Sequence, residues 1–132
     1  MIEIYLDENL SEYVADALNS LNKGYFRDIA VFSTKLKFGK GAKDEQIIPA
    51  IGKAKGILLT KDLNINRTRA QYDLCLQYKL GVFFLKPTKG LDRHWEIVKM
   101  LLNNWELIIE KIKDERFPFG YEIPMRGKMR KL

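Results

Sequence analysis

With 132 residues, the chain is long enough for one domain that buries roughly two thirds of the surface its unfolded form exposes, so folding requires neither a metal ion nor a disulfide. Hydrophobic residues make up 46% and charged residues 30%, which excludes wholesale disorder and a fibrous architecture. The only cysteine, Cys75, excludes an internal disulfide, and its helical spacing from apolar neighbours predicts a core position. Because we find no signal peptide and no long apolar span, we expect a cytoplasmic protein without membrane contact.

The positive charge is concentrated in two segments. The formal net charge is +6, and the segment 126–132 carries four cations, at Arg126, Lys128, Arg130 and Lys131. Further lysines lie between Lys35 and Lys43, where glycines predict a flexible loop. Such cations hold an anionic polymer by neutralising its phosphates. A solvated loop and a frayed terminus are the alternative interpretation of the two segments.

The first half of the chain alternates strands and helices. The apolar run 2–6 predicts a strand, and apolar residues then recur at helical spacing from Leu10 until Gly24 ends the pattern. A second strand is predicted at 29–32, followed by a helix around residues 47–51. Pro49 indicates that this helix either begins nearer Ile47 than Asp44 or kinks, because proline suits the first helical turn.

Two further strands are predicted at 57–60 and 82–85, with a helix at about 68–78 between them. Strands that alternate with helices are typical of a parallel sheet. We therefore predict an α/β fold, a small open parallel sheet of order about 2-1-3-4 with helices on both faces. In this order the first and third strands are neighbours, and their helices cover opposite faces.

The last third of the chain predicts a long helix at about 92–113. Apolar residues at alternating spacings of three and four form one stripe, at Trp95, Val98, Leu102, Trp105, Ile109 and Ile112. This stripe either packs onto the sheet or forms a seam with a second copy or another protein. Residues 117–124 are expected to form a turn and a short extended piece. Without repeats or linkers, we expect a single domain, 1–132, divided into a core of about 1–90, the long helix, and an extended basic tail, 114–132.

Acidic residues follow two of the predicted strands. Asp7 comes directly after the first strand, and Asp62 follows the third, so both fall at the switch point where open α/β sheets bind ligands. Asp44 or Glu45 could join them from the preceding helix. Clustered carboxylates repel unless a cation lies between them, and a hard divalent ion such as Mg²⁺ takes oxygen ligands. The pattern predicts a metal site, although each acid alone also suits a helix cap or a solvated loop.

Other chemistries are excluded by the residues present. One histidine and one cysteine cannot build a Cys/His zinc site or a histidine-based triad of the usual kind. The chain also lacks the glycine-rich patterns that cradle phosphates or dinucleotides. His94 begins the long helix, far in sequence from the acids, and is expected to be structural.

Four short sequence segments resemble those of the PIN-like domains related to VapC-type toxins. They are the segment 6–10, Asp44-Glu45 leading into 48–53, the segment 58–62, and Phe83-Phe84-Leu85. The similarity spans residues 1 to about 112. It implies a ribonuclease that depends on Mg²⁺ or Mn²⁺ and acts on RNA. Many such proteins are toxins of toxin–antitoxin pairs, so the resemblance also implies an antitoxin partner, and the apolar stripe leaves a homodimer open.

Carried over by position, the resemblance implies that the catalytic metal ligands are Asp7, Asp62 and either Asp44 or Glu45. Asn64 stands where many PIN-like sequences have another acid, so one or two metal ions remain open. Asn9 and Asn64 are expected to orient ligands or waters. Five cations are expected to grip the RNA backbone: Lys61, Arg67, Arg69, Lys40 and Lys43.

Two interpretations from other functional classes are alternatives to the nuclease. A receiver-like signalling domain also has acids after the first and third strands, and Lys86-Pro87 follows the fourth strand here. However, only 24 residues separate Asp62 from Lys86, which is too few for the further strand and helix of a receiver. The other alternative is a non-catalytic nucleic-acid-binding module whose acids only cap helices.

Overall fold

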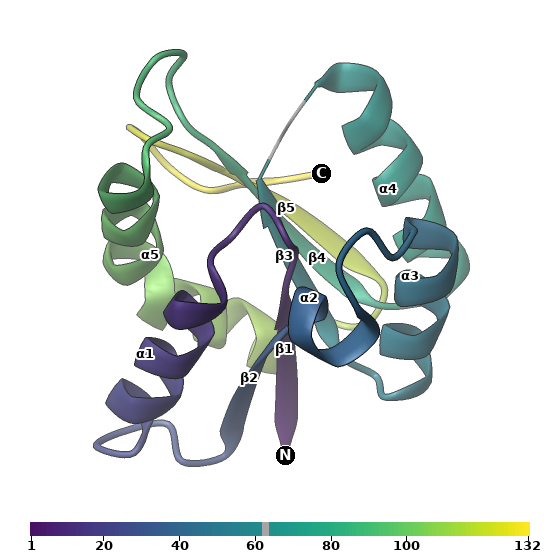
Figure 1. The fold of residues 1–132 in the computed structure, drawn as a ribbon, viewed down its shortest axis with the longest axis horizontal. Coiled ribbons are helices and arrows are strands. Elements are labelled where there is room, and N and C mark those ends of the chain that lie inside the picture. Colours follow the sequence, from purple (N-terminus) through teal and green to yellow (C-terminus); the bar gives the residue numbers. More distant parts are fainter. Residues whose placement is uncertain (62–63) are drawn as a thin grey trace.

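Short runs of buried apolar residues form the strands of one sheet in the computed structural model, which describes residues 1–61 and 64–132 (Figure 1). Among these residues the strand order is β2-β1-β3-β4-β5-β6. Neighbours from β2 to β5 pair in parallel, and β6 pairs antiparallel to β5. The strands are β1 (Ile2–Leu6), β2 (Ile29–Ser33), β3 (Ile57–Lys61), β4 (Gly81–Lys86), β5 (Phe119–Pro124) and β6 (Arg130–Lys131). The predicted order 2-1-3-4 is confirmed.

Helices cover both faces of the sheet, as predicted (Figure 1). One face is covered by α1 (Glu12–Asn22) and α5 (His94–Asp114). The other face is covered by α2 (Thr34–Phe38), α3 (Asp44–Lys53) and α4 (Ile65–Gln77). Successive residues of a strand point to opposite faces of the sheet, and an apolar core lies on each face. Ile4 and Leu6 therefore pack towards α1 and α5, whereas Tyr5 packs towards α3. Among the described residues, no helix is long and apolar enough to cross a lipid bilayer.

The long helix α5 buries only part of its predicted apolar stripe. Trp105, Ile109 and Ile112 belong to the core, but Trp95 is 67% exposed and Leu102 is 49% exposed. The first turns of α5 lie beside α1 and leave a groove between the two helices. Farther along, Trp105 Nε1 donates to Asn22 Oδ1 at 3.0 Å and ties α5 to the end of α1. Packing onto the sheet therefore explains the second half of the stripe but not the first.

The segment expected to be a turn and a short extended piece contains a strand of the sheet. Phe119, Tyr121 and Ile123 of β5 are buried under α5, and β5 pairs with the whole length of β4. Without β5, the edge of β4 would expose a row of unpaired backbone groups among buried side chains. The basic end of the chain is also not a free tail. Lys131 Nζ lies 3.0 Å from Glu115 Oε2, and Arg130 pairs with Glu122.

The predicted flexible loop 35–43 is wrong for its first half. Ser33 Oγ accepts from the Leu36 N–H at 3.4 Å and caps α2, which contains Lys35 and Lys37. Lys35 pairs with Glu12 at 3.4 Å, and Lys37 Nζ lies 4.2 Å from the centroid of the Phe32 ring. These two lysines are therefore engaged within the domain.

The helix α3 begins at Asp44 itself and accommodates Pro49 in its interior. Proline has no N–H, so this helix lacks the backbone bond that residue 49 would otherwise donate. Of the two predicted alternatives, the start nearer Ile47 is therefore wrong, and the kink at Pro49 stays a prediction. As a consequence, Asp44 lies in the first helical turn, where the exposed N–H groups favour a negative charge.

Candidate functional site

Asp7 lies at the carboxyl end of β1 and is buried, with 3% of its surface exposed. Its backbone N–H donates to the Leu59 carbonyl at 3.0 Å and extends the pairing of β1 with β3. Its side chain Oδ2 accepts from Thr60 Oγ1 at 2.9 Å. A buried carboxylate is unfavourable unless hydrogen bonds or a cation replace its water. The Thr60 hydroxyl provides part of this replacement among the residues that the structure describes.

Asp44 lies close to Asp7, at the start of α3. Its pKa is raised above the ordinary range of an aspartate, first by burial and second by the Asp7 carboxylate. The Arg67 guanidinium opposes this shift and lowers the pKa of Asp44. The structure therefore brings together two of the predicted acids, from elements 37 positions apart in the sequence.

The helix α4 supplies the other wall of this acidic site. Gln71 is buried, with 2% of its surface exposed, and its side chain lowers the pKa of Asp44. Its Nε2 atom nevertheless makes no hydrogen bond of normal geometry with a described residue. One turn later, burial first and Asp44 second raise the pKa of Cys75 to about 12. Asp44 thus lies against the face of α4 that carries Gln71 and Cys75.

Glu45 and Glu8 lie at the margin of the site. Glu45 is exposed and is the last of the neighbours that raise the pKa of Asp44. Of the two alternatives at this position, Asp44 is therefore the acid that the structure brings beside Asp7. Glu8 is exposed and accepts from the Gly41 N–H at 3.0 Å, which joins the end of β1 to the loop before α3.

Asp62, the remaining predicted ligand, lies outside the described residues. Among the described residues, no group of three or more His, Cys, Asp or Glu side chains could hold a metal ion. The donors that are described nevertheless suit a hard divalent cation, because two carboxylates lie close enough to repel and both offer oxygen atoms. The Gln71 amide, whose Nε2 atom makes no hydrogen bond with a described residue, is a further polar group at this site.

The two predicted asparagines lie in different environments. Asn64 caps α4, because its side chain Oδ1 accepts from the Arg67 N–H at 2.9 Å. Asn9 is half-buried and lines a hollow of about 220 Å³ together with Lys61 and Asp92. Its Nδ2 atom has no partner among the described residues. A role for either asparagine in orienting a ligand remains a prediction.

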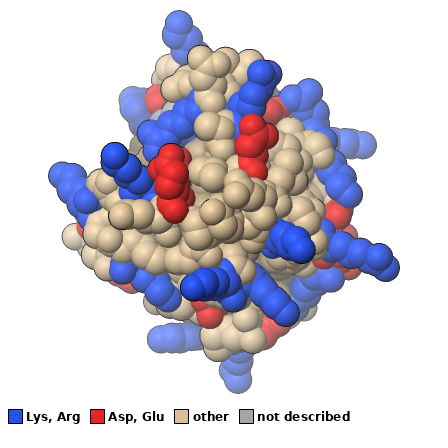
Figure 2. Space-filling model, turned by 90° about the vertical axis from the view of Figure 1, so that its right-hand side faces the viewer, with Lys and Arg blue, Asp and Glu red and all other residues tan. Residues whose placement is uncertain are grey.

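The predicted RNA-binding cations surround the same edge of the sheet. Lys61 pairs with Asp92 at 3.2 Å, and Arg67 lies near enough to Asp44 to lower its pKa. The other three are exposed: Arg69, Lys40 and Lys43. Figure 2, seen from the side of α3 and α4, shows Lys and Arg side chains spread over this face and its margins, with a few Asp and Glu between them. The charge is distributed rather than gathered in one patch.

Two residues of the site were not predicted from the sequence, Thr60 and Gln71. Thr60 is the only polar residue among the buried residues of β3, and it lies on the same face as Leu58, which packs under α3 and α4. Gln71 precedes Cys75 by one helical turn, so the two share the buried side of α4. A polar residue in the register of a buried face was the available signal in both cases.

Comparison with protein families gives one match. The family described as PIN like domain matches residues 2–87, more than half of the chain, from β1 to the end of β4. The matched region contains Asp7, Asp44, Glu45 and Asp62 and ends before α5. Comparisons with curated proteins and with solved structures found no significant match.

Proposed function

This chain belongs to the family of PIN-like domains, and from that premise we propose that it is a metal-dependent ribonuclease that hydrolyses RNA phosphodiester bonds. PIN-like domains have a nuclease-type fold, are generally hydrolases and typically use divalent metals. The observation that carries the finer proposal is the pairing of buried Asp7 with Asp44, whose pKa is raised first by burial and second by the Asp7 carboxylate. Two neighbouring acids at the switch point of an open sheet favour a catalytic role over a structural one, because their repulsion does not stabilise the fold.

In this proposal Asp7, Asp44 and Asp62 hold Mg²⁺ or Mn²⁺, and Glu45 lies beside them. When bound, the ion would polarise the phosphoryl oxygen and acidify the attacking water. Thr60 fixes the orientation of Asp7 through its 2.9 Å hydrogen bond. Gln71 and Arg67 act on Asp44 from α4 and favour its ionised form, which is the form that binds a cation.

The RNA backbone is gripped by the cations around the acidic edge: Lys61, Arg67, Arg69, Lys40 and Lys43. Arg and Lys side chains beside a carboxylate site bind RNA phosphates close to the acids. Their positive charge offsets the repulsion between the phosphates and the carboxylates. Asn64 contributes indirectly, because capping α4 holds Arg67 at the start of that helix. Asn9 contributes polar contacts from the neighbouring hollow.

The cellular role proposed here is that of the toxin in a toxin–antitoxin pair. It is supported by the resemblance of the segment 6–10 and the segment 58–62 to VapC-type toxins. An antitoxin protein would have to cover the edge that carries Asp7 and Asp44 or insert a cation there. An arginine suits this purpose, because it binds carboxylates through two parallel hydrogen bonds.

Incubation of labelled RNA with purified wild type, Asp7→Asn and Asp44→Asn tests the reaction. We expect wild type to cleave RNA with Mg²⁺ or Mn²⁺ but not with a chelator, and both variants to lose at least roughly 100-fold in rate. Asp73→Asn, which changes an exposed acid on α4, is the matched control and should keep full activity. Cleavage in the presence of chelator, or equal cleavage by Asp7→Asn, would contradict the proposal. Labelled DNA in parallel defines the substrate.

A further inference from the structure

A hollow of about 220 Å³ lies at the carboxyl edge of the sheet, on the face that α1 and α5 cover. The buried part of its lining is apolar and consists of Leu10, Val14 and Ile97. Polar side chains complete the lining, among them Lys61 and Asp92. An apolar hollow with a few convergent polar groups is the usual form of a site for a small organic group.

This hollow adjoins the acidic site across the ends of β1 and β3. The Leu10 N–H donates to the Asp7 carbonyl at 2.9 Å, so a tight turn leads from the buried acid to the hollow. On β3, Lys61 directly follows Thr60, whose hydroxyl donates to Asp7. A nucleic acid whose phosphate lies over Asp7 and Asp44 therefore has an adjacent base beside the hollow.

An ion pair forms one wall of the hollow. Lys61 Nζ donates to Asp92 Oδ2 at 3.2 Å, and this hydrogen bond is the first cause of the lowered pKa of the Asp92 carboxyl. Asp92 is therefore a carboxylate at neutral pH. Both oxygens of a carboxylate offer more than one acceptor site, so Asp92 can accept further hydrogen bonds while it holds Lys61. An ammonium donor and a carboxylate acceptor thus stand side by side.

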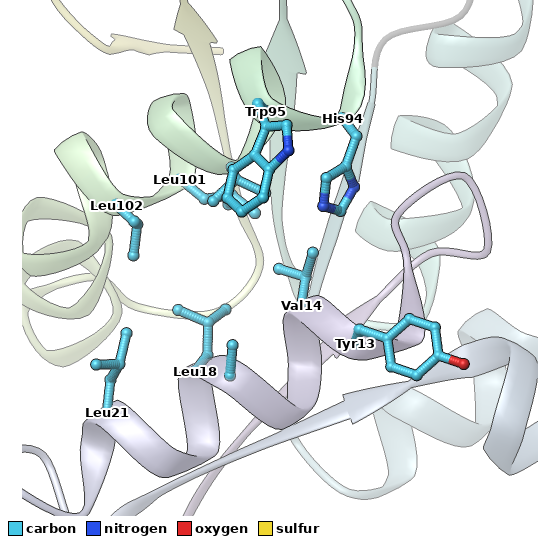
Figure 3. Close-up of a pocket in the computed structure, with 10 residues that line it drawn as sticks. Tyr13, Val14, Leu18, Leu21, His94, Trp95, Leu101 and Leu102 are labelled. Carbon is cyan, nitrogen blue, oxygen red and sulfur yellow. The ribbon is translucent and has the colours of Figure 1, made fainter.

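His94, in the first turn of α5, supplies an aromatic ring to the same hollow. Figure 3 shows this ring turned towards Val14 of α1, beside Trp95. The rings of His94 and Trp95 meet edge to face, with centroids 5.2 Å apart. His94 is exposed, so core packing does not account for its place. Histidine rings are among the surfaces on which unpaired bases of RNA stack.

We propose that the hollow binds a guanine base of the RNA substrate, with the base edge on the Lys61–Asp92 pair and the ring of His94 stacked on the base. The volume suits one base, because pockets for drug-sized molecules span roughly 300–1,000 Å³. Guanine alone offers, on its pairing edge, neighbouring N–H donors for one carboxylate and a carbonyl acceptor for an ammonium. The other bases offer a single donor group there. This subsite rests on the proposed ribonuclease and defines its base preference.

Fluorescence anisotropy of short labelled RNAs, with the full chain in chelator so that no RNA is cleaved, tests the subsite. Wild type should bind a uridine oligomer with one central guanine roughly tenfold more tightly than oligomers with adenine, cytosine or uracil there. Asp92→Asn should lose this preference. Asp28→Asn is the matched control and should keep it, because Asp28 is also an exposed acid paired with a lysine, Lys113 at 3.4 Å, but lies at the amino edge of the sheet.

Replacement of the ring separates stacking from reading of the base edge. His94→Ala should weaken the binding of all four oligomers roughly tenfold, because stacking tolerates every base. Tyr25→Ala, which removes an exposed ring from the loop between α1 and β2, is the control and should bind as wild type does. Circular dichroism of each variant verifies that it is folded. A His94→Ala variant with unchanged affinity would overturn the stacking.

Equal affinity of wild type for the four oligomers would overturn the inference. A loss for all four in Asp92→Asn would do so too, because that result is expected if Asp92 only holds Lys61 in place. Guanosine monophosphate that binds wild type, without any preference for guanine in RNA, would assign the hollow to a free nucleotide instead. Because none of these measurements needs cleavage, an inactive protein that prefers guanine would contradict the proposed ribonuclease alone. An active protein without the preference would contradict this subsite alone.

Discussion

The two faces of the sheet depart from an ordinary packed surface in opposite ways. On the face of α3 and α4, Asp7, Asp44 and Gln71 bring polar groups into the interior at its carboxyl edge. On the face of α1 and α5, the buried Asn22 bonds Trp105 far from that edge, and the large side chains of Trp95 and Tyr13 remain in solvent. Buried polar groups and exposed apolar patches are the informative exceptions to normal burial. The first points to chemistry and the second to association.

The largest expected effect is biological and separates the two faces directly. If the protein is a toxin-like ribonuclease, its production alone should arrest bacterial growth, because an unrestrained nuclease degrades an essential RNA pool. Asp7→Asn should abolish the arrest, since it keeps the size of the side chain and removes a charge that binds the ion. Growth curves after induction measure the effect.

Trp95→Glu, on the opposite face, is the control for the growth experiment. It should retain the arrest, because the groove takes no part in cleavage. Folded protein must accumulate to matched levels in all three strains. Equal arrest by wild type and Asp7→Asn would show that any toxicity comes from the basic surface and not from catalysis.

The second prediction concerns the ion itself. Mg²⁺ or Mn²⁺ should raise the melting temperature of wild type by about 10 °C at an ion concentration about 100 times the dissociation constant, because only the folded state gathers the acids. Asp7→Asn, Asp44→Asn and Asp62→Asn should each blunt this rise. Differential scanning fluorimetry with and without a chelator measures it. Asp16→Asn, an exposed acid on the face of α1, should respond as wild type does; an identical response in all variants would remove the metal site.

Much of this division into faces could be predicted from the sequence. The short apolar runs and the helical stretches between them predicted β1 to β4 and their order, and the handedness of crossovers then placed Asp7 at a switch point. The same reasoning explains why Asp44 and Asp7 converge. These inferences succeed because they depend on local periodicity and on rules that hold for almost every parallel sheet.

What could not be predicted depends on contacts between distant segments. The spacing of Trp95, Leu102 and Trp105 shows that they share a helical face, but not that α1 leaves the first two uncovered. The run Phe119–Ile123 alternates like a strand, yet its flanking prolines and short length leave its pairing with β4 to tertiary structure. Gln71 resembles any helical glutamine until Asp44 is placed beside it.

The third prediction tests the repulsion between Asp7 and Asp44 through thermal stability rather than through activity. Because the pKa of Asp44 is raised in the folded state, protonation stabilises the fold. That stabilisation is fully present below the pKa of an unfolded aspartic acid, about 3.9, and is lost as the pH rises through the higher folded value. In chelator at pH 7, Asp44→Asn should therefore melt above wild type, by roughly 3–5 °C for each kcal/mol of repulsion and burial relieved.

Thermal melts of Asp44→Asn and wild type between acidic and neutral pH measure this difference. It should shrink as the pH falls, because protonated aspartic acid and asparagine are both neutral. Asp73→Asn, an exposed acid, should show no such trend. A variant that is less stable than wild type at pH 7 would mean that Asp44 is held by favourable contacts rather than strained against Asp7.

The smallest expected effect concerns the basic end of the chain. The turn 125–129 follows the carboxyl end of β5, and β5 is parallel to β1, so this turn lies at the same edge of the sheet as Asp7. Deleting 126–132 would remove β6 together with the ion pairs of Arg130 and Lys131. A change in RNA affinity could then come from lost structure as well as from lost charge. Arg126 and Lys128 form no ion pair with any described residue, so Arg126→Gln with Lys128→Gln removes charge alone.

This double variant should bind RNA several-fold more weakly and flatten the salt dependence of its affinity. If both cations contact phosphates, the slope of log K against log salt should fall by about 1.4, since each contact to a single strand contributes about 0.7. Lys53→Gln with Lys55→Gln removes the same charge near the amino end of β3, at the opposite edge, and should change the slope little. Cleavage at saturating RNA should persist in both variants, because neither pair touches the acids. Equal slopes in the two double variants would mean that the carboxyl-terminal cations serve solubility, and that RNA is held by the cations of α4 and the loop before α3.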